Sequence, residues 1–441
     1  MRNYWRGGVL SAAGIAIIAA TFVLVQHLSF RPQQTHASIP APPKPALALP
    51  SVPSIAVLPF ANLSGDPSQE YFSDGITDDL ITDISRVPKL FVIARTSSFT
   101  YKGKAEKAQT IGRELGVKYL LEGSTRRAGD QVRINVQLVD AATGNEVWSQ
   151  RYDRQMRDIF KLQDEIVQSL TTTVGLQLSV LEKGMDIPQR TTNLEAYDYY
   201  LRAMEASLTG TSEGIAKARK MLEKSLQLDP GYADAYASLG FWDWLSYAWQ
   251  LNSDPRTLDR AAELANKAIA LDNANALAYT VRAWVAADEG ERNRAIADSE
   301  KAVSFDPNSA WAWLARADIN EIVLGKPEDT LVYAQKAIRL DPRHPELDCL
   351  PQGMAYNRMG RYTQAVEALK ACMQNNPWVH IDLVLAYSEL GREEEARAEA
   401  AEVLRVNPQF SLEQMEQSRG GDWQDPRWQH VLAVLRTAGV K

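Results

Sequence analysis

Four closely spaced aspartates make the densest set of potential metal ligands in the sequence. They lie in the segment YFSDGITDDLITDISRV, whose acidic positions are Asp74, Asp78, Asp79 and Asp83. Carboxylate oxygens are preferred ligands of Mg²⁺ and Ca²⁺, so one hypothesis is a metal site. A structural role is favoured, because Asp74 is placed to cap a helix and early acids stabilise the positive end of the helix dipole. We therefore predict no metal site and no cofactor.

The remaining groups able to do chemistry are few and scattered. The five histidines form no HExxH or HxH pair, and two cysteines in 441 residues exclude an all-cysteine zinc site. No phosphate-binding GxxxxGK[ST] motif, strand-linked GxGxxG motif or GxSxG nucleophile motif occurs. We predict that the chain is not an enzyme. Its net charge of -7, from 48 Lys+Arg and 55 Asp+Glu, argues against nucleic-acid binding.

A helical repeat in the C-terminal half supplies most of the elements that must position candidate binding residues. Similar three-residue motifs, such as Leu-Asp-Pro, recur along this half. They end at Pro230, Asn273, Pro307, Pro342, Pro377 and Pro408. Their spacing is close to the period of about 34 residues that is typical of tetratricopeptide repeats. One longer interval indicates an insertion at 251–257. We predict an all-α solenoid of about six repeats over 195–408, followed by a capping segment over 409–441.

Large apolar side chains recur on the first helix of these predicted repeats. The phase set by the prolines places seven of them on the concave side, namely Phe241, Trp244, Trp284, Trp311, Met354, Trp378 and Leu385. Aromatic side chains in a groove are typical anchors for a protein or peptide partner. The alternative is that several pack between neighbouring helices as core. Polar specificity is expected from Arg316, Asp318, Glu321, Asn357 and Arg358, unless these residues form a solvated face.

The two cysteines fall on the two helices of one predicted hairpin. Antiparallel packing would bring Cys349 and Cys372 together, so one hypothesis is a disulfide that closes a loop of about 23 residues. The alternative is a pair of buried free thiols.

Residues 54–183 are predicted to form a compact α/β domain. Its clearest strand alternates Val132, Ile134, Val136 and Leu138 with polar residues, so that one face is buried and one is wet. Turns at 128–130 and 143–145 predict hairpins on both sides of this strand. The order of elements, β-α-β-α-β-β-β-α, predicts a mixed sheet with helices against one face.

This domain resembles a known family. The segments SIAVLPFANLSGDPSQEYFSDGITDDL, LFVIARTSSFTYKGK, RELGVKYLLEGSTRRAGDQVRINVQLVDAATG and DIFKLQDEI resemble the TolB-like amino-terminal domain. That domain occurs in bacterial signalling proteins, often after a nucleotide cyclase or winged-helix domain and a membrane span, and before tetratricopeptide repeats. The resemblance implies an exported protein-binding or assembly domain without catalytic residues. The cyclase domain and its paired aspartates have no matching positions in this sequence.

Residues 7–30 contain no charged side chain and are predicted to anchor the chain in a membrane. Their apolar heart, Val9–Val25, is long enough as a helix to span a hydrocarbon core of about 30 Å. Arg2 and Arg6 precede it, which favours a cytoplasmic N-terminus and a periplasmic location for the rest. The alternative is a signal peptide cleaved near Ala37, with release into the periplasm.

Together these features predict a single-pass protein of the bacterial inner membrane, in contact with the bilayer through residues 9–30. The predicted segments are a stub and anchor at 1–30, a proline-rich linker at 31–53, the α/β domain at 54–183, a linker at 184–194, the repeats at 195–408 and the cap at 409–441. The expected function is a protein–protein interaction scaffold. The alternative is a sensor that binds a small solute and signals to a separate cytoplasmic effector such as a nucleotide cyclase. Small residues at Gly8, Ala12 and Ala16 are a faint sign of a homodimer formed through the span.

Overall fold

The computed structural model describes most of the chain after its N-terminal segment. The described residues are 47–175, 191–207, 211–248, 254, 256–344, 346, 349–408, 410–413 and 426–440. They belong to one compact unit, Ala46–Lys441. The predicted anchor, most of the proline-rich linker and residues 176–190 lie outside the described residues. Within the described ranges, no helix has the length and apolar character needed to cross a bilayer.

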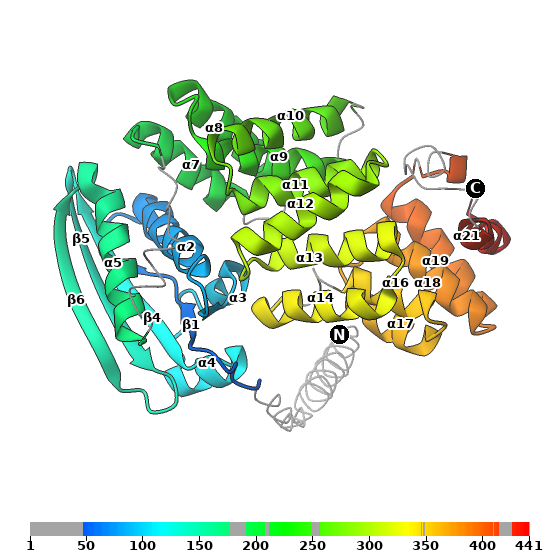
Figure 1. The fold of residues 1–441 in the computed structure, drawn as a ribbon, viewed down its shortest axis with the longest axis horizontal. Coiled ribbons are helices and arrows are strands. Elements are labelled where there is room, and N and C mark those ends of the chain that lie inside the picture. Colours follow the sequence, from blue (N-terminus) through cyan, green and yellow to red (C-terminus); the bar gives the residue numbers. More distant parts are fainter. Residues whose placement is uncertain are drawn as a thin grey trace, which may run out of the picture. The chain divides into compact units, whose positions relative to one another are not determined.

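The N-terminal domain is built on one mixed sheet (Figure 1). Its strands are β1 Ser54–Val57, β2 Ala61–Asn62, β3 Phe91–Val92, β4 Tyr119–Ala128, β5 Gln131–Asp140 and β6 Glu146–Gln155. The strand order is β3-β1-β4-β5-β6, with β2 added beside β4. Strand β1 runs parallel to β3 and β4, whereas β4, β5 and β6 form an antiparallel meander. The predicted mixed sheet is therefore confirmed.

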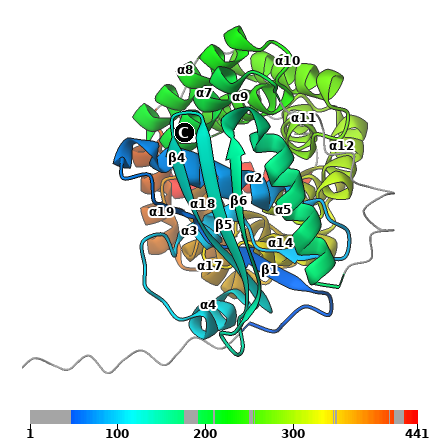
Figure 2. The same cartoon turned by 90° about the vertical axis from the view of Figure 1, so that its left-hand side faces the viewer.

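Helices cover parts of both faces of this sheet. Helices α2 Glu70–Ser85 and α5 Ile159–Thr173 pack on the face that includes Ile55 and Val57. Helix α4 Ala108–Leu115 packs on the opposite face, against Ala56 and Leu58. The prediction that all helices lie against one face is wrong, because consecutive residues of β1 point to opposite sides and every one of them is buried. In Figure 2 the long strands β4, β5 and β6 lie side by side and face the viewer.

Gly116 ends helix α4, whereas Asp74 does not cap the start of helix α2. Helix α4 ends at Gly116, whose φ of 63° places it in the left-handed region that favours glycine at a helix end. Helix α2 begins four residues before Asp74, after a 3₁₀ turn at Pro67–Gln69 that Asp66 caps by accepting from the Ser68 N–H. Asp74 is therefore not the helix cap. Its buried carboxylate instead accepts from Lys102 Nζ of the following segment, at 2.6 Å.

Six consecutive helix pairs follow in the described residues (Figure 1). They are α7 Leu194–Ser207 with α8 Ser212–Leu228, α9 Ala233–Ala248 with α10 Arg256–Leu271, α11 Ala276–Asp288 with α12 Arg292–Phe305, α13 Ala310–Ile319 with α14 Pro327–Leu340, α16 Leu350–Arg358 with α17 Tyr362–Lys370, and α18 Pro377–Glu389 with α19 Glu393–Val406. A π-helical turn, η3 Asn320–Leu324, extends α13, a 3₁₀ turn, η2 Met156–Asp158, precedes α5, and α3 Arg95–Phe99 and α21 Pro426–Ala438 complete the described helices. Fully buried alanines such as Ala237, Ala268 and Ala278 allow close helix packing.

The α/β domain packs directly on the first helix of the solenoid. Tyr197 of α7 is fully buried, and its hydroxyl donates to the carboxylate of Asp79 on α2. Gln163 of α5 donates to the same carboxylate at 2.7 Å, and the Phe160 ring meets the Tyr197 ring edge-on at 4.9 Å between centroids. This buried network joins α2, α5 and α7.

A second contact joins the α/β domain to the turns between later repeats. Asn308 follows α12, and its side chain accepts from the Val92 N–H at 3.1 Å and donates to the carbonyls of Ser85 and Leu90 at 2.7 and 2.9 Å. Asp341, at the end of α14, accepts from the hydroxyls of Thr96 and Ser97. We call these contacts, together with the Tyr197 network, the domain junction.

Arg339 adds to the domain junction by donating hydrogen bonds to the carbonyls at the C-terminal end of α4. Its guanidinium donates to the carbonyls of Leu115 and Gly116 at 3.0 and 2.7 Å and to that of Ala48 at 3.1 Å. It also lies over an aromatic face, since its carbon Cζ is 4.4 Å from the centroid of the Phe91 ring. A cation at a helix C-terminus is favoured by the helix dipole.

The junction should make stability depend on pH through Asp341. Burial raises the pKa of this carboxyl above its ordinary value of 3.8, and the hydroxyls of Ser97 and Thr96 oppose that rise only in part. Because the folded state then binds the proton more tightly than the unfolded state, the free energy of unfolding should fall as pH rises from about 4 through the folded pKa. Urea unfolding at several pH values should show that the free energy of unfolding falls less steeply with rising pH in the Asp341→Asn variant than in the unchanged protein. An unchanged slope would contradict this assignment.

Candidate functional site

Four of the seven predicted partner-binding residues meet in one cluster on the first helices of repeats two to four. We call Phe241 and Trp244 of α9, Trp284 of α11 and Trp311 of α13 the aromatic cluster. Trp244 stacks on Trp284 with centroids 4.0 Å apart and planes 5° apart. Trp311 meets both Phe241 and Trp284 edge-on, with centroids 5.1 and 6.3 Å away. The contact between Phe241 and Trp311 joins two repeats that are not neighbours along the solenoid.

Exposure divides this cluster into core and surface. Phe241 and Trp284 are only 6% and 4% exposed, so they serve mainly as packing between helices. Trp244 and Trp311 are half-buried and present part of their rings to solvent. The two half-buried indoles are therefore the members that can contact a partner.

The other three predicted residues lie apart from the aromatic cluster. Trp378 of α18 packs edge-on against Phe410, with centroids 6.2 Å apart, in a core that includes α21. Met354 of α16 and Leu385 of α18 are half-buried. The described contacts thus place the seven residues along the first helices without assembling them into one site.

Two carboxylates accompany the aromatic cluster in a repeated arrangement. The indole N–H of Trp244 donates to Asp288 Oδ2 at 3.2 Å, and that of Trp284 donates to Asp318 Oδ2 at 3.0 Å. In both cases the tryptophan belongs to one repeat and the aspartate to the first helix of the next. The sequence pointed to Asp318 but missed Asp288, although its place at the end of a first helix was a usable signal.

The polar residues predicted on later repeats contact side chains and carbonyls of neighbouring helices. Arg358 of α16 pairs with Glu321, which is 1% exposed, and also donates to the Glu321 carbonyl at 3.0 Å. Its neighbour Asn357 donates to the backbone carbonyl of Asp382 at 2.9 Å and to its Oδ1 at 3.2 Å. Arg316 turns to the second helix of the preceding repeat, where it donates to Glu300 at 2.8 Å.

Asn357 has an unmet hydrogen-bonding group. The residue is 6% exposed, and both of its bonds to Asp382 use the amide nitrogen. Its Oδ1 atom is buried and accepts no hydrogen bond within the described part of the chain. The orientation of the amide is fixed, because the two atoms facing the nitrogen are acceptors.

A polar hollow on the sheet is a second candidate site. It has a volume of about 500 Å³ and is lined by residues of β4, β5 and β6, among them Glu122, Asn135, Gln137 and Arg151. Several lining groups are already paired, since Gln137 donates to Glu122 at 2.7 Å and Asn135 donates to Ser124 at 3.0 Å. The hollow can offer hydrogen bonds to a small polar solute.

The acidic run of α2 takes part in protein contacts. Asp74 pairs with Lys102, Asp78 with Arg95 at 3.1 Å, and Asp79 with Tyr197. In the ranges that the structure describes, no group of three or more His, Cys, Asp or Glu side chains is arranged to hold a metal ion. These aspartates instead link α2 to the elements around it.

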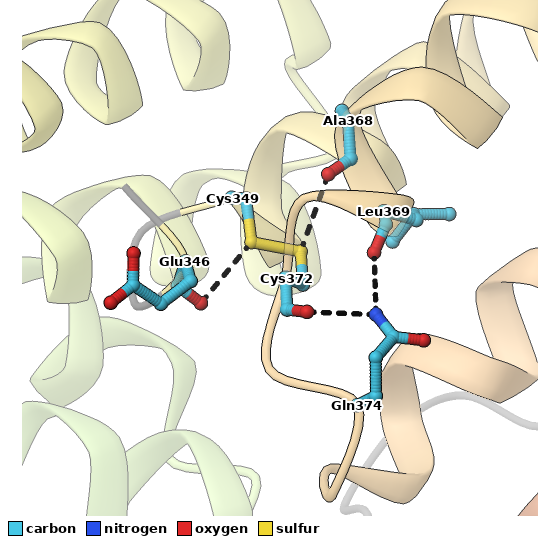
Figure 3. The surroundings of a disulfide bond; sticks show 6 residues. All are labelled: Glu346, Cys349, Ala368, Leu369, Cys372 and Gln374. Carbon is cyan, nitrogen blue, oxygen red and sulfur yellow. Dashed lines mark hydrogen bonds between the residues drawn. A yellow bond between two sulfur atoms is a disulfide. The ribbon is translucent and has the colours of Figure 1, made fainter. Parts of the chain in front are cut away.

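A disulfide joins Cys349 and Cys372 in the structure (Figure 3). Cys349 immediately precedes α16 and Cys372 lies two residues beyond α17, so the bond ties the start of one helix to the end of its partner. Both side chains are buried. Each sulfur also lies near a backbone carbonyl, that of Glu346 at 3.3 Å or that of Ala368 at 3.5 Å, so a thiol at either position would find an acceptor.

We expect the disulfide to stabilise the fifth repeat. Closing a loop of 23 residues by a disulfide stabilises a fold by about 3 kcal/mol, so the Cys349→Ser/Cys372→Ser variant should unfold at lower urea concentration. Thiol titration of the unfolded, unreduced chain should detect no free thiol. Two thiols in protein isolated under conditions that block exchange would contradict the expectation.

Comparisons with known proteins confirm the repeats and add a different relative for the sheet domain. Residues 276–309 and 357–415 match tetratricopeptide repeat models. Residues 51–168 match the HilA/YgeH-like transcriptional regulator, second domain. The resemblance to a TolB-like domain is not clearly shown by these matches.

One curated relative shares a long segment with this chain. The chain is 46% identical over 236 residues to "Putative adenylate cyclase 3" of Rhizobium meliloti (strain 1021), a match that covers 53% of this chain and 40% of that protein. The chain therefore spans less than half the length of this relative.

Solved structures resemble the chain only in part. A thermophilic tetratricopeptide protein of Thermus thermophilus is 19% identical, and the likeness covers 47% of this chain and 98% of that one, with a TM-score of 0.35. TolB from Acinetobacter baumannii is 16% identical over 30% of each chain, with a TM-score of 0.21. Neither likeness is close enough to carry an argument about function.

Proposed function

We propose that this protein is an interaction scaffold of a bacterial signalling assembly. The predicted helix at Val9–Val25 holds it at the inner membrane, and the α/β domain and the solenoid face the periplasm. The tetratricopeptide repeats support this proposal most directly, since stacked helix pairs create extended surfaces that bind protein partners. The TolB-like resemblance of the sheet domain agrees with an exported assembly role.

The surface on the first helices is the proposed docking site. Half-buried Trp244 and Trp311 supply aromatic contact area, and Asp288 and Asp318 stand beside the aromatic cluster. Tryptophan is enriched among the residues that carry binding energy at interfaces. Helical and extended peptides both use such rows of anchors.

The alternative function is a sensory or regulatory component. The polar hollow on β4, β5 and β6 favours it, because it offers a place for a small polar solute. The name of the relative, "Putative adenylate cyclase 3", also favours an association with a cyclase effector. In this function the domain junction would transmit a change in the α/β domain to the solenoid.

In-cell photo-crosslinking tests the scaffold proposal. A photoreactive amino acid at Trp311, and separately at Trp244, should yield an adduct with a discrete periplasmic protein. The matched control is the same amino acid at Val332, which is 50% exposed on the second helix α14. An adduct at Val332 of equal yield, or none at Trp311 and Trp244 in folded and exported protein, would contradict docking at this surface.

A topology measurement separates the cellular location from the docking question. Single cysteines at exposed positions, in a chain with Cys349→Ser and Cys372→Ser, should react with a membrane-impermeant maleimide in intact spheroplasts. Labelling only after lysis would overturn the periplasmic location without bearing on the surface itself.

A further inference from the structure

We infer that the polar hollow on β4, β5 and β6 binds a short peptide with a free amino end and a free carboxyl end. The amino end would lie beside the carboxylates of Glu122 and Glu146, and the carboxyl end beside the guanidinium of Arg151. The inference rests on the alternative function and adds the chemical class of the solute. It does not involve the aromatic cluster of the solenoid.

The hollow lies on the polar face of the three long strands. Ile134, Val136 and Tyr152 point to the opposite face, where they are buried in the core that includes α2 and α5. Helix α4 covers the polar face only at the end near Leu120, and Figure 2 shows β4, β5 and β6 facing the viewer beyond it. The hollow is therefore open to a solute from outside.

Strand pairing arranges six of the lining side chains in two rows. Each row contains one residue from each of the three strands, with Glu122, Gln137 and Ser149 in the first row and Ser124, Asn135 and Arg151 in the second. Residues two positions apart on a strand point to the same face and lie about 7 Å from each other. The two rows are therefore separated by about 7 Å along the strands.

The first row carries negative charge. Glu122 Oε2 accepts from the Gln137 amide at 2.7 Å. Glu146 Oε1 accepts from the Ser149 hydroxyl at 2.6 Å, which brings a second carboxylate to the same row. Both donors are neutral, and among the residues that the structure describes neither carboxylate pairs with a lysine or an arginine. Because a carboxylate can accept about four hydrogen bonds, both can still accept from an ammonium group.

The second row offers a positive charge. The side chain of Arg151 is 65% exposed, and its Nε lies 3.4 Å from Asp153 Oδ2. The other oxygen of Asp153 accepts from Arg133 at 2.6 Å, so this carboxylate is shared between two arginines. A guanidinium has five N–H donors in a planar fork that matches a carboxylate. Arg151 can therefore bind the carboxyl end of a peptide while its Nε still faces Asp153.

The separation of the two rows determines the length of the peptide. An extended chain advances about 3.5 Å per residue, so a dipeptide places its two charged ends about 7 Å apart. The charges of a single amino acid are closer together and cannot reach both rows. The hollow has a volume of about 500 Å³, within the range of sites for small ligands. The amide groups of Asn135 and Gln137 can form hydrogen bonds with the peptide group between the two ends.

Isothermal titration calorimetry with dialanine tests the inference on the full-length chain in detergent. Dialanine should bind, and N-acetyl-dialanine and dialanine amide should each bind about fivefold more weakly, because each lacks one of the two ion pairs. Free alanine should also bind more weakly than dialanine. Equal affinities of the capped and uncapped dipeptides, or no binding of dialanine, would overturn the inference.

A pair of variants locates the binding in the hollow. Glu146→Gln/Arg151→Gln removes one charge of each sign from exposed side chains and should weaken dialanine binding about tenfold. Glu393→Gln/Arg397→Gln is the matched control, because it removes an exposed ion pair of 2.8 Å on α19 and also leaves the net charge unchanged. The control should bind dialanine like the unchanged protein. Equal weakening by the two variants would contradict binding in the hollow.

A neutral solute separates this inference from the alternative function on which it rests. If sucrose binds more tightly than dialanine, the hollow takes a small polar solute and the peptide is wrong. If neither solute binds, both the inference and the alternative function lose their support. Docking on the first helices is tested independently, by crosslinking from Trp311 and Trp244, so neither result changes the scaffold proposal.

Discussion

Replacing Asn308 by aspartate should be among the most damaging single changes in this protein. The side chain of Asn308 faces one donor, the Val92 N–H, and two acceptors, the carbonyls of Ser85 and Leu90. An aspartate keeps the acceptor for Val92 but brings its negative charge against the two carbonyls in a buried site. We expect a loss of about 4 kcal/mol, within the range for an uncompensated buried charge.

Comparing Asn308→Asp with Asn308→Ala separates the effect of the introduced charge from the effect of the lost hydrogen bonds. Asn308→Ala removes the same bonds without adding charge and should cost about 2 kcal/mol, the scale of a few unmade buried bonds. Protonation of the introduced carboxyl should reduce its harm, because a neutral acid can donate to one carbonyl. The gap between the two variants in urea unfolding should therefore narrow as the pH is lowered.

The result would be overturned by equal stabilities of the aspartate and alanine variants at neutral pH. It would also be overturned by a gap between them that does not change with pH. If Asn308→Asp fails to fold at neutral pH, refolding at acidic pH would still separate the charge effect from a simple loss of packing.

The parts of the fold that sequence predicted are those fixed by nearby residues. The alternation in β5 fixes which face is buried, and the turns around Gly129 and Gly144 fix its two hairpins. Both glycines adopt positive φ, as tight turns require. The stop of α4 at Gly116 and the helix pairs of the solenoid follow from signals of the same short range.

The domain junction could not be read from such signals. Asn308 and Ser85 are 223 residues apart, and nothing in the triplet Phe305–Pro307 distinguishes a turn that contacts another domain from one that faces water. The same limit explains Asp74, whose spacing suited a helix cap. Its actual partner, Lys102, comes from a segment whose approach to α2 is decided by tertiary packing.

The candidate site shows where repeat phase stops being informative. Phase identifies the first helices and the side that carries Trp244, Trp284 and Trp311. It does not give the curvature of the solenoid, which decides that Phe241 reaches Trp311 across an intervening repeat and that Trp284 becomes core. The aspartates beside the cluster were hard to rank, because a carboxylate near a helix end is equally common on a solvated face.

The second large effect is expected where the first solenoid helix enters the α/β domain. Tyr197→Ala should cost about 4 kcal/mol, because it removes a fully buried ring that packs on Phe160 and leaves a cavity. Tyr197→Phe keeps the ring and removes only the hydroxyl that donates to Asp79, so it should cost about 2 kcal/mol. The difference in stability between the two variants measures the packing of the ring. The loss in Tyr197→Phe measures the hydrogen bond to Asp79.

The Asp79→Asn variant then tests why Tyr197→Phe lowers stability. The expected reason is that the buried carboxylate of Asp79 loses the hydrogen bond from the Tyr197 hydroxyl. Asparagine still accepts from Gln163 and carries no charge, so Tyr197→Phe should cost less in the Asp79→Asn protein than in the unchanged one. We expect a coupling of about 1 kcal/mol in a double-mutant cycle measured by urea unfolding. Strictly additive losses would mean that Asp79 and Tyr197 contribute independently to stability, which would contradict this assignment.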